Sequence, residues 1–231
     1  MTVREEAAHR IFRTGSFKID IKEGFKIALH DKLPNAPLSP FYLNLRPKGT
    51  KGGTLTQADI DVIGYAMVLK GHEAELFTQI RPVCSIPAAG NPFLDSMLAF
   101  LQGEGIELKR FQLEKMDVSG KRAFRLAPED LAVWKDVLLI DDLVTSTQTK
   151  GLALEPIIKM RGTVPDLLVF LNRSTTAAFE LKQMGIRLHT VWEFENLMEW
   201  ALGKAYLNRI QYETIVDYPA VLEAYTKKAV A

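Results

Sequence analysis

The sequence predicts an α/β protein with a central parallel twisted sheet flanked by helices. Short apolar runs without polar interruptions alternate along the chain with helix-like segments. Such runs are typical of strands that are covered on both faces, as in a parallel sheet. The 231 residues are also enough to bury one core of this kind. We therefore expect a single domain over residues 1–231.

The expected elements are read from apolar spacing and from capping residues. The strands of the sheet are expected at 80–86, 106–111, 137–140, 167–171 and 186–191. Helices are expected at 2–13, 57–69, 93–101, 150–161, 193–205 and 208–225. Thr56 has a side chain suited to the N-cap of the second helix.

Two segments outside the sheet have patterns of their own. Residues 17–21 alternate apolar and charged side chains, as a half-buried strand does, and 25–29 is a candidate second strand of the same hairpin. The segment 114–122 is polar and basic and contains a glycine, so we expect it to be a loop.

The composition is that of an ordinary globular protein, with 47% apolar and 25% charged residues. The net charge of +1 gives no general attraction for nucleic acid. Because Cys84 is the single cysteine, neither a disulfide framework nor a cysteine-rich metal site is possible. The N-terminus lacks an apolar signal segment and no run is as long as a membrane span, so we expect a cytoplasmic protein that binds no membrane.

The most informative stretch is 137–150. Its apolar run ends in two adjacent acids, Asp141 and Asp142, and a helix-like segment begins at Lys150. The polar residues of the intervening loop are Thr145, Ser146, Thr147, Gln148 and Thr149. Since ligands of open α/β sheets bind beyond the carboxyl ends of the strands, this loop is a candidate binding site.

The chemistry of this stretch suits a sugar phosphate. A helix N-terminus presents unpaired N–H groups to a phosphate, and hydroxyl side chains add donors. Carboxylates repel phosphate, but they accept hydrogen bonds from sugar hydroxyls and can hold magnesium. From the residues alone, the alternative is a capped helix after a buried strand, with both acids in solvent.

The run from the apolar strand through both acids to the hydroxyl-rich loop resembles the phosphoribosyl-diphosphate motif of type I phosphoribosyltransferases. The resemblance implies that Asp141 and Asp142 bind the ribose hydroxyls and that residues 145–149 hold the 5-phosphate. It also implies Mg²⁺ as the cofactor, with Asp142 as its ligand. Relatives usually have glycine where this chain has Thr147 and a small residue where it has Gln148.

Two further segments take roles from the same resemblance. In the family, a small-residue loop like Ala88, Ala89 and Gly90 receives the pyrophosphate, while a tight strand–helix turn is the alternative. The basic segment 109–122 stands where relatives have a mobile loop that closes over the diphosphate. Lys115 is our candidate for the catalytic cation of that loop, and a solvated surface loop is the alternative.

Three features make the chain most similar to the orotate branch of the family. Phe41 and Tyr42 lie in a Ser-Pro-aromatic-aromatic run like that of the family's hood, which packs over the pyrimidine; ordinary core aromatics are the alternative. Arg173 follows a strand where the family has an arginine that pairs with the orotate carboxylate. Gln-Tyr-Glu at 211–213 matches the C-terminal segment. The hood is expected to comprise about residues 15–46 and the C-terminal helices.

The resemblance implies transfer of a 5-phosphoribosyl group from phosphoribosyl diphosphate to orotate, giving orotidine 5′-monophosphate and pyrophosphate. It also implies a homodimer. Two alternatives stay open: a phosphoribosyltransferase for another base, and a regulatory protein that binds phosphoribosyl diphosphate without catalysis. Thr147 and the Gln-Leu-Glu at 112–114, where the family has Arg-Lys-Glu, support the second alternative.

Overall fold

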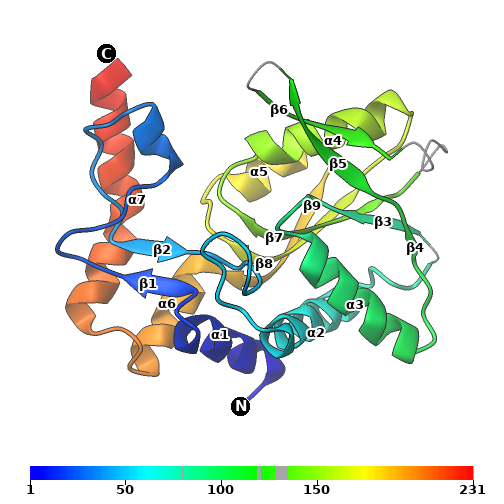
Figure 1. Cartoon of the computed structure of the whole chain (residues 1–231), viewed down its shortest axis with the longest axis horizontal. Coiled ribbons are helices and arrows are strands. Elements are labelled where there is room, and N and C mark those ends of the chain that lie inside the picture. Colours follow the sequence, from blue (N-terminus) through cyan, green and yellow to red (C-terminus); the bar gives the residue numbers. More distant parts are fainter. Residues whose placement is uncertain (80, 119–120, 128–134, 231) are drawn as a thin grey trace. The chain divides into compact units, whose positions relative to one another are not determined.

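The computed structural model describes residues 1–79, 81–118, 121–127 and 135–230 (Figure 1). The chain divides into two compact units. The first combines Met1–Ala7 with Thr56–Phe194, and the second combines Ala8–Leu55 with Glu195–Ala231. The second unit thus brings together the residues expected as the hood and the C-terminal helices.

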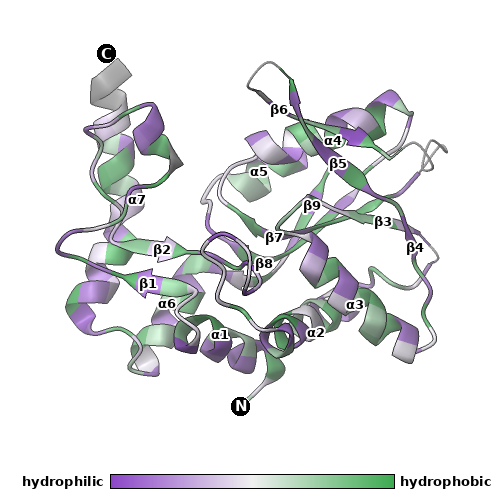
Figure 2. Cartoon of the chain, in the orientation of Figure 1, coloured by the Kyte–Doolittle hydropathy of each residue, from purple (hydrophilic) through white to green (hydrophobic). Residues whose placement is uncertain are grey.

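The first unit contains a five-stranded parallel sheet with the strand order β4-β3-β7-β8-β9 (Figure 1). The strands are β3 Pro82–Ser85, β4 Lys109–Arg110, β7 Leu138–Val144, β8 Asp166–Asn172 and β9 Arg187–Glu193. All seven residues of β8 are buried, and the central strands carry the hydrophobic colour in Figure 2. The predicted α/β fold with a parallel sheet flanked by helices is therefore confirmed.

Helices cover both faces of this sheet. On one face lie α2 (Gln57–Glu73) and α3 (Asn91–Gly103), and on the other lie α4 (Gln148–Lys159) and α5 (Ala177–Gln183). Thr56 caps α2 as predicted, since its hydroxyl accepts a hydrogen bond from the backbone N–H of Asp59 at 3.3 Å. The core on the α4 face includes Leu139, Leu154, Leu167 and other buried apolar side chains.

The segment expected to be a basic loop is largely a β-hairpin. Strands β5 (Leu113–Val118) and β6 (Lys121–Leu126) pair antiparallel, and β6 packs against α4. The physical reason is that Leu113 and Leu126 face each other across the two strands and are both buried. Residues 119–120 of the predicted loop lie outside the described residues.

The second unit contains a small antiparallel sheet and two helices. Strand β1 (Phe17–Ile19) pairs with β2 (Phe41–Leu43), whereas the predicted second strand at 25–29 is wrong. A short 3₁₀ turn, η1 (Ala28–Asp31), takes up part of that segment. The C-terminal helices are α6 (Phe194–Gly203) and α7 (Arg209–Val230), and α1 (Val3–Arg13) begins the chain. None of the described helices is both long and apolar enough to cross a membrane.

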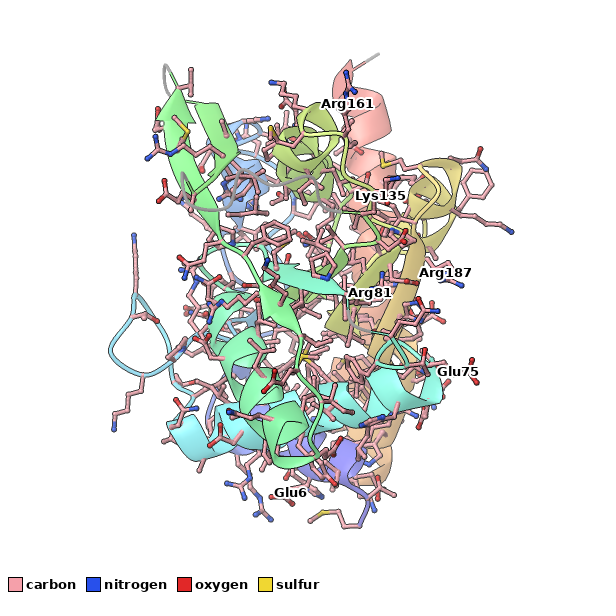
Figure 3. All side chains as sticks on the ribbon, turned by 90° about the vertical axis from the view of Figure 1, so that its right-hand side faces the viewer. Glu6, Glu75, Arg81, Lys135, Arg161 and Arg187 are labelled. Atoms are coloured by element: carbon pink, nitrogen blue, oxygen red, sulfur yellow. The ribbon has the colours of Figure 1, made fainter. Side chains whose placement is uncertain are left out.

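At the edge of the sheet where the strands begin, Asp166 forms hydrogen bonds with residues from neighbouring segments. Its side chain is fully buried, and its carboxylate accepts hydrogen bonds from Arg81 at 2.9 Å, from Arg187 at 2.9 Å and from His189 at 2.8 Å. Figure 3 faces this edge and labels Arg81 and Arg187. The Asp166 carboxylate thus links the first residues of β8 and β9 with Arg81, beside the start of β3, and the candidate site lies at the opposite edge.

Candidate functional site

The two acids at the end of β7 have different surroundings. Asp141 is only 4% exposed, and its carboxylate forms an ion pair with the ammonium group of Lys150, which is 3% exposed. The same ammonium donates to the carbonyl oxygen of Leu143 at 2.9 Å. The other oxygen of Asp141 accepts from the backbone N–H of Asp142 at 2.9 Å. Asp141 is therefore engaged on both oxygens by the protein itself.

Asp142 is the more accessible of the two acids. Because side chains alternate along a strand, it projects to the opposite side of β7 from Asp141. It is half-buried, and one carboxylate oxygen accepts from the backbone N–H of Leu143 at 2.8 Å. Burial and the neighbouring charge of Asp141 raise the pKa of Asp142 to about 8.

The predicted phosphate loop lies directly beyond these acids. Thr145, Ser146 and Gln148 are exposed, and Thr147 and Thr149 are half-buried at the start of α4. Among the described residues, no hydrogen-bond acceptor is found for the backbone N–H groups of residues 145–149. Five such groups at a helix N-terminus form a ready cradle for an anion.

A residue from α5 reaches this loop. The hydroxyl of Thr147 does not cap α4; it donates to one carboxylate oxygen of Glu180. Thr176 donates to the other oxygen at 2.6 Å. These two hydroxyls, Thr147 first, hold the pKa of Glu180 below its usual value.

The small-residue loop after β3 packs against the end of β7. A Cβ atom on Gly90 would lie 3.0 Å from the carbonyl oxygens of Ile86 and Ile140 and 3.2 Å from the Cα of Asp141. The absence of a side chain therefore allows the close approach. The peptide bond between Pro87 and Ala88 is cis. Within the described chain, the backbone N–H groups of Ala88 and Ala89 have no acceptor, so a second set of donors lies beside the acids.

Arg173 lies at the same edge of the sheet. Its backbone N–H donates to the carbonyl oxygen of Val144 at 2.8 Å, which ties the start of the loop after β8 to the end of β7. Its half-buried guanidinium lies 5.8 Å from the ring centroid of Phe194. The first unit thus brings together the acids, both loops and the predicted arginine, as parallel strands that end at one edge require.

The position of Phe41 differs from the predicted wall that faces the base. Within the second unit it is 2% exposed, and its ring stacks on Phe17 with the centroids 5.3 Å apart. It therefore belongs to the core of this unit and is not an open wall for a base. Alternation along β2 places Tyr42 on the other face, where it is 37% exposed. Of the two aromatic residues predicted to face the base, Tyr42 is the one with an exposed side chain, and its role stays a prediction.

Lys115 is exposed and stands opposite Phe124, on the face of the hairpin that also carries Leu113. Its ammonium group has no hydrogen bond or ion pair within the described part of the chain. The hairpin instead contains an ion pair between Arg125 and Glu114 at 2.6 Å. The structure therefore leaves Lys115 as a solvated cation, without a contact to either acid.

The side chains at this edge fit a magnesium ion only with help from a ligand. No group of three or more metal-ligating side chains occurs among the described residues. Mg²⁺ in nucleotide-type sites is commonly held by one or two carboxylates together with substrate phosphates and water. The half-buried Asp142 carboxylate beside two phosphate-type loops fits that mode.

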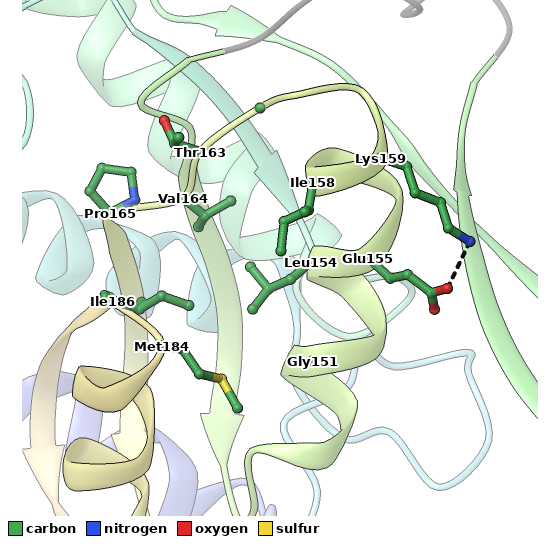
Figure 4. A pocket seen from close by; sticks show the side chains of 12 residues that line it. Gly151, Leu154, Glu155, Ile158, Lys159, Thr163, Val164, Pro165, Met184 and Ile186 are labelled. Carbon is green, nitrogen blue, oxygen red and sulfur yellow. Dashed lines mark ion pairs between the residues drawn. The ribbon is translucent and has the colours of Figure 1, made fainter.

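A separate apolar cavity lies along α4. It has a volume of about 680 Å³ and contains none of the predicted site residues. Its apolar lining includes Leu154, Ile158, Val164, Met184 and Ile186, and the Glu155–Lys159 ion pair stands at its rim (Figure 4). Its lining does not suit a sugar phosphate, because it offers few polar groups.

Sequence comparison finds similarity to known orotate phosphoribosyltransferases. Models of known protein families give no match. The chain is 28% identical over 104 residues to the orotate phosphoribosyltransferase of Saccharolobus solfataricus, covering 45% of this chain and 46% of that protein. It is 23% identical over 198 residues to that of Pyrobaculum aerophilum, covering 81% of this chain and 89% of that protein. The first match thus spans about half of the relative's length.

A solved structure decides the fold. The orotate phosphoribosyltransferase of Francisella tularensis superposes with a TM-score of 0.64 and 16% identity, covering 91% of this chain and 95% of that one. The chain has the type I phosphoribosyltransferase fold. The resemblance predicted from the sequence, to type I phosphoribosyltransferases and most of all to the orotate enzymes, is confirmed.

Two residues that contact the phosphoribosyltransferase motif are missing from the sequence predictions. Lys150 could have been found, because it precedes Ala153, Leu154 and Ile157 at the spacing of one buried helix face. A buried lysine needs an acidic partner, and the two acids at the end of the preceding strand are candidates for it. Glu180 is 33 residues from Thr147, and no local pattern indicates their contact.

Proposed function

We propose that this chain is a phosphoribosyltransferase that transfers the 5-phosphoribosyl group of phosphoribosyl diphosphate to orotate. The products are orotidine 5′-monophosphate and pyrophosphate. The type I phosphoribosyltransferase fold and the sequence similarity to two curated orotate enzymes support this proposal.

One observation carries the proposal beyond fold. The unpaired N–H groups of residues 145–149 lie at one end of the acid pair, and those of Ala88 and Ala89 lie at its side. Two anion cradles flanking a carboxylate match a ligand with a phosphate at one end, a diphosphate at the other and hydroxyls between them. Phosphoribosyl diphosphate has this arrangement of groups.

Each residue then has a defined role. Asp142 binds the ribose hydroxyls through hydrogen bonds, and in its ionised form its charge stabilises the positive charge that develops on the ribose as the anomeric C–O bond breaks. Asp141, held by Lys150, positions the backbone between the two acids. Residues 145–149 bind the 5-phosphate, Ala88 to Gly90 bind the diphosphate, and Arg173 pairs with the carboxylate of orotate.

Magnesium would be held by Asp142 together with oxygens of the diphosphate, and when bound it neutralises charge on the leaving pyrophosphate. Lys115, on an exposed strand of the hairpin, would have to approach the diphosphate from solvent to assist. The homodimer also remains a prediction from the family resemblance, and light scattering coupled to gel filtration would measure it.

The test is a direct assay. Purified protein is mixed with orotate, phosphoribosyl diphosphate and Mg²⁺, and the loss of orotate absorbance is followed. At a pH above 8, where Asp142 is ionised, we expect turnover that falls about a hundredfold in Asp142→Asn, because a charge interaction with the transition state is lost. Arg173→Ala should raise the KM for orotate about tenfold or more. Folded wild-type protein that produces no absorbance change would exclude the orotate activity.

A second candidate is a protein that binds phosphoribosyl diphosphate without transferring its sugar. The engaged carboxylate of Asp141 and the solvated position of Lys115 favour this candidate, because both reduce the charged groups available at the site. Calorimetric binding of the diphosphate, with no pyrophosphate released in the presence of orotate or other bases, would establish it.

A further inference from the structure

Glu180 stands beside the loop to which the proposed function assigns a phosphate. Its two carboxylate oxygens accept hydrogen bonds from Thr147, in the loop, and from Thr176, at the start of α5. The residue is half-buried, and within the described chain no cation forms an ion pair with it. An uncompensated negative charge therefore lies at the mouth of an anion cradle.

The position of this charge has a physical explanation. The N-terminus of α4 carries a partial positive charge and unpaired N–H groups, which favour any nearby anion. Without a bound phosphate, the carboxylate of Glu180 accepts the hydrogen bond of the Thr147 hydroxyl, which the loop would otherwise offer to a ligand. The N–H groups of the loop stay open within the described chain, so Glu180 occupies only part of the phosphate site.

We propose that Glu180 competes with the 5-phosphate for the loop and so determines how strongly the chain binds phosphorylated ribose. This inference rests on the proposed function of the loop. A phosphate that enters must displace the carboxylate from Thr147, and it must also bind against the negative charge that stays nearby. Both effects lower the affinity for the phosphate end of the ligand and spare the diphosphate end.

A purely structural role makes a different prediction. If Glu180 only braces α5 against the loop, a glutamine can keep both contacts: its amide oxygen accepts from one hydroxyl and its amide N–H donates to the oxygen of the other. The substitution Glu180→Gln would then leave ligand affinity unchanged. If Glu180 competes through its charge, the same substitution strengthens phosphate binding.

The experiment measures dissociation constants by calorimetry for ribose 5-phosphate, phosphoribosyl diphosphate and pyrophosphate. We expect Glu180→Gln to bind the first two about tenfold more tightly, the scale of one charge interaction over a few ångströms. Pyrophosphate, which lacks the 5-phosphate, should change less than twofold. Glu155→Gln, which removes an exposed acid elsewhere near α4, is the matched control and should behave as the wild type.

Several outcomes would overturn the inference. These are equal affinity of wild type and Glu180→Gln for ribose 5-phosphate, weaker binding by the variant, or an equal gain for pyrophosphate. Should Glu180→Gln fail to fold, Glu180→Ala gives the same comparison. If the tenfold gain occurs without any transfer to orotate, the competition by Glu180 stands and the proposed enzymatic function fails. If neither the wild type nor the variant binds any of the three ligands, both proposals fail.

Discussion

Asp141 and Asp142 are neighbours of the same type, but because side chains alternate along β7 they lie in different environments. Asp141 turns toward α4 and meets Lys150, whereas Asp142 turns away and remains half-buried. The sequence predicts both acids as equal ligands of a ribose, because nothing in the dipeptide itself distinguishes them. The difference comes from a lysine nine residues later, on the buried face of a helix.

The buried pair of Asp141 and Lys150 predicts a stability effect that depends on which partner is removed. Asp141→Asn or Lys150→Met alone leaves a buried charge without its partner and should lower the free energy of unfolding by about 3 kcal/mol. The double variant removes both charges, so it should recover at least about half of that loss. Urea unfolding of the three variants measures this coupling.

The exposed pair of Glu155 and Lys159 provides the control. Both side chains are more than half exposed, so Lys159→Met should cost no more than about 0.5 kcal/mol. If the double variant Asp141→Asn/Lys150→Met loses as much stability as the two single variants together, the two charges are not coupled in solution.

At the level of elements, the site is made by loops that follow strands β3, β7 and β8. The sequence located all three strands from their apolar runs, and with them the loops, because apolar runs mark buried strands directly. It missed the hairpin of β5 and β6, because the buried Leu113, Phe124 and Leu126 share one face with Lys115, Asp117 and Arg122, which hides the apolar pattern. The contact of Glu180 with Thr147 depends on how two helices pack, which local patterns do not determine.

The approach of the loop after β3 to the end of β7 predicts that Gly90→Ala disturbs both stability and binding. Gly90 has an ordinary negative φ of −74°, so the difficulty is space: the new Cβ would stand 3.0 Å from two carbonyl oxygens. We expect a loss of about 1–3 kcal/mol in the free energy of unfolding. We also expect weaker binding of pyrophosphate, because the loop must shift away from Asp141.

Gly103 is the matched control for this substitution. It ends α3, and a Cβ there would meet no atom within 4 Å. Gly103→Ala should therefore leave pyrophosphate binding unchanged. Thermal unfolding and calorimetry of the two variants make the comparison, and equal behaviour of both would refute the packing argument for Gly90.

For the whole molecule, most of the predicted site residues lie within one unit, in loops that follow strands of the predicted parallel sheet. Asp142, residues 145–149, Ala88 to Gly90 and Arg173 all belong to the first unit. Tyr42 belongs to the second, which gathers residues from both ends of the chain. The sequence grouped those ends through family resemblance, because no local pattern of apolar residues connects segments so far apart.

The raised pKa of Asp142 should be visible in the stability of the chain as a function of pH. Burial and Asp141 raise this pKa from its usual 3.8 to about 8, so between these values the folded state holds a proton that the unfolded state has lost. Stability contributed by the neutral form is complete below about pH 4 and is lost as the pH rises toward 8. Asp142→Asn removes this titration. The free energy of unfolding of the variant should therefore rise relative to that of the wild type between pH 4 and 8, and the difference should level off above pH 8.

Urea unfolding at a series of pH values, with Glu155→Gln as the control for one lost surface charge, measures the difference. A constant difference between Asp142→Asn and wild type from pH 4 to 8 would mean that Asp142 is already ionised throughout, and that the site holds two carboxylate charges and not one.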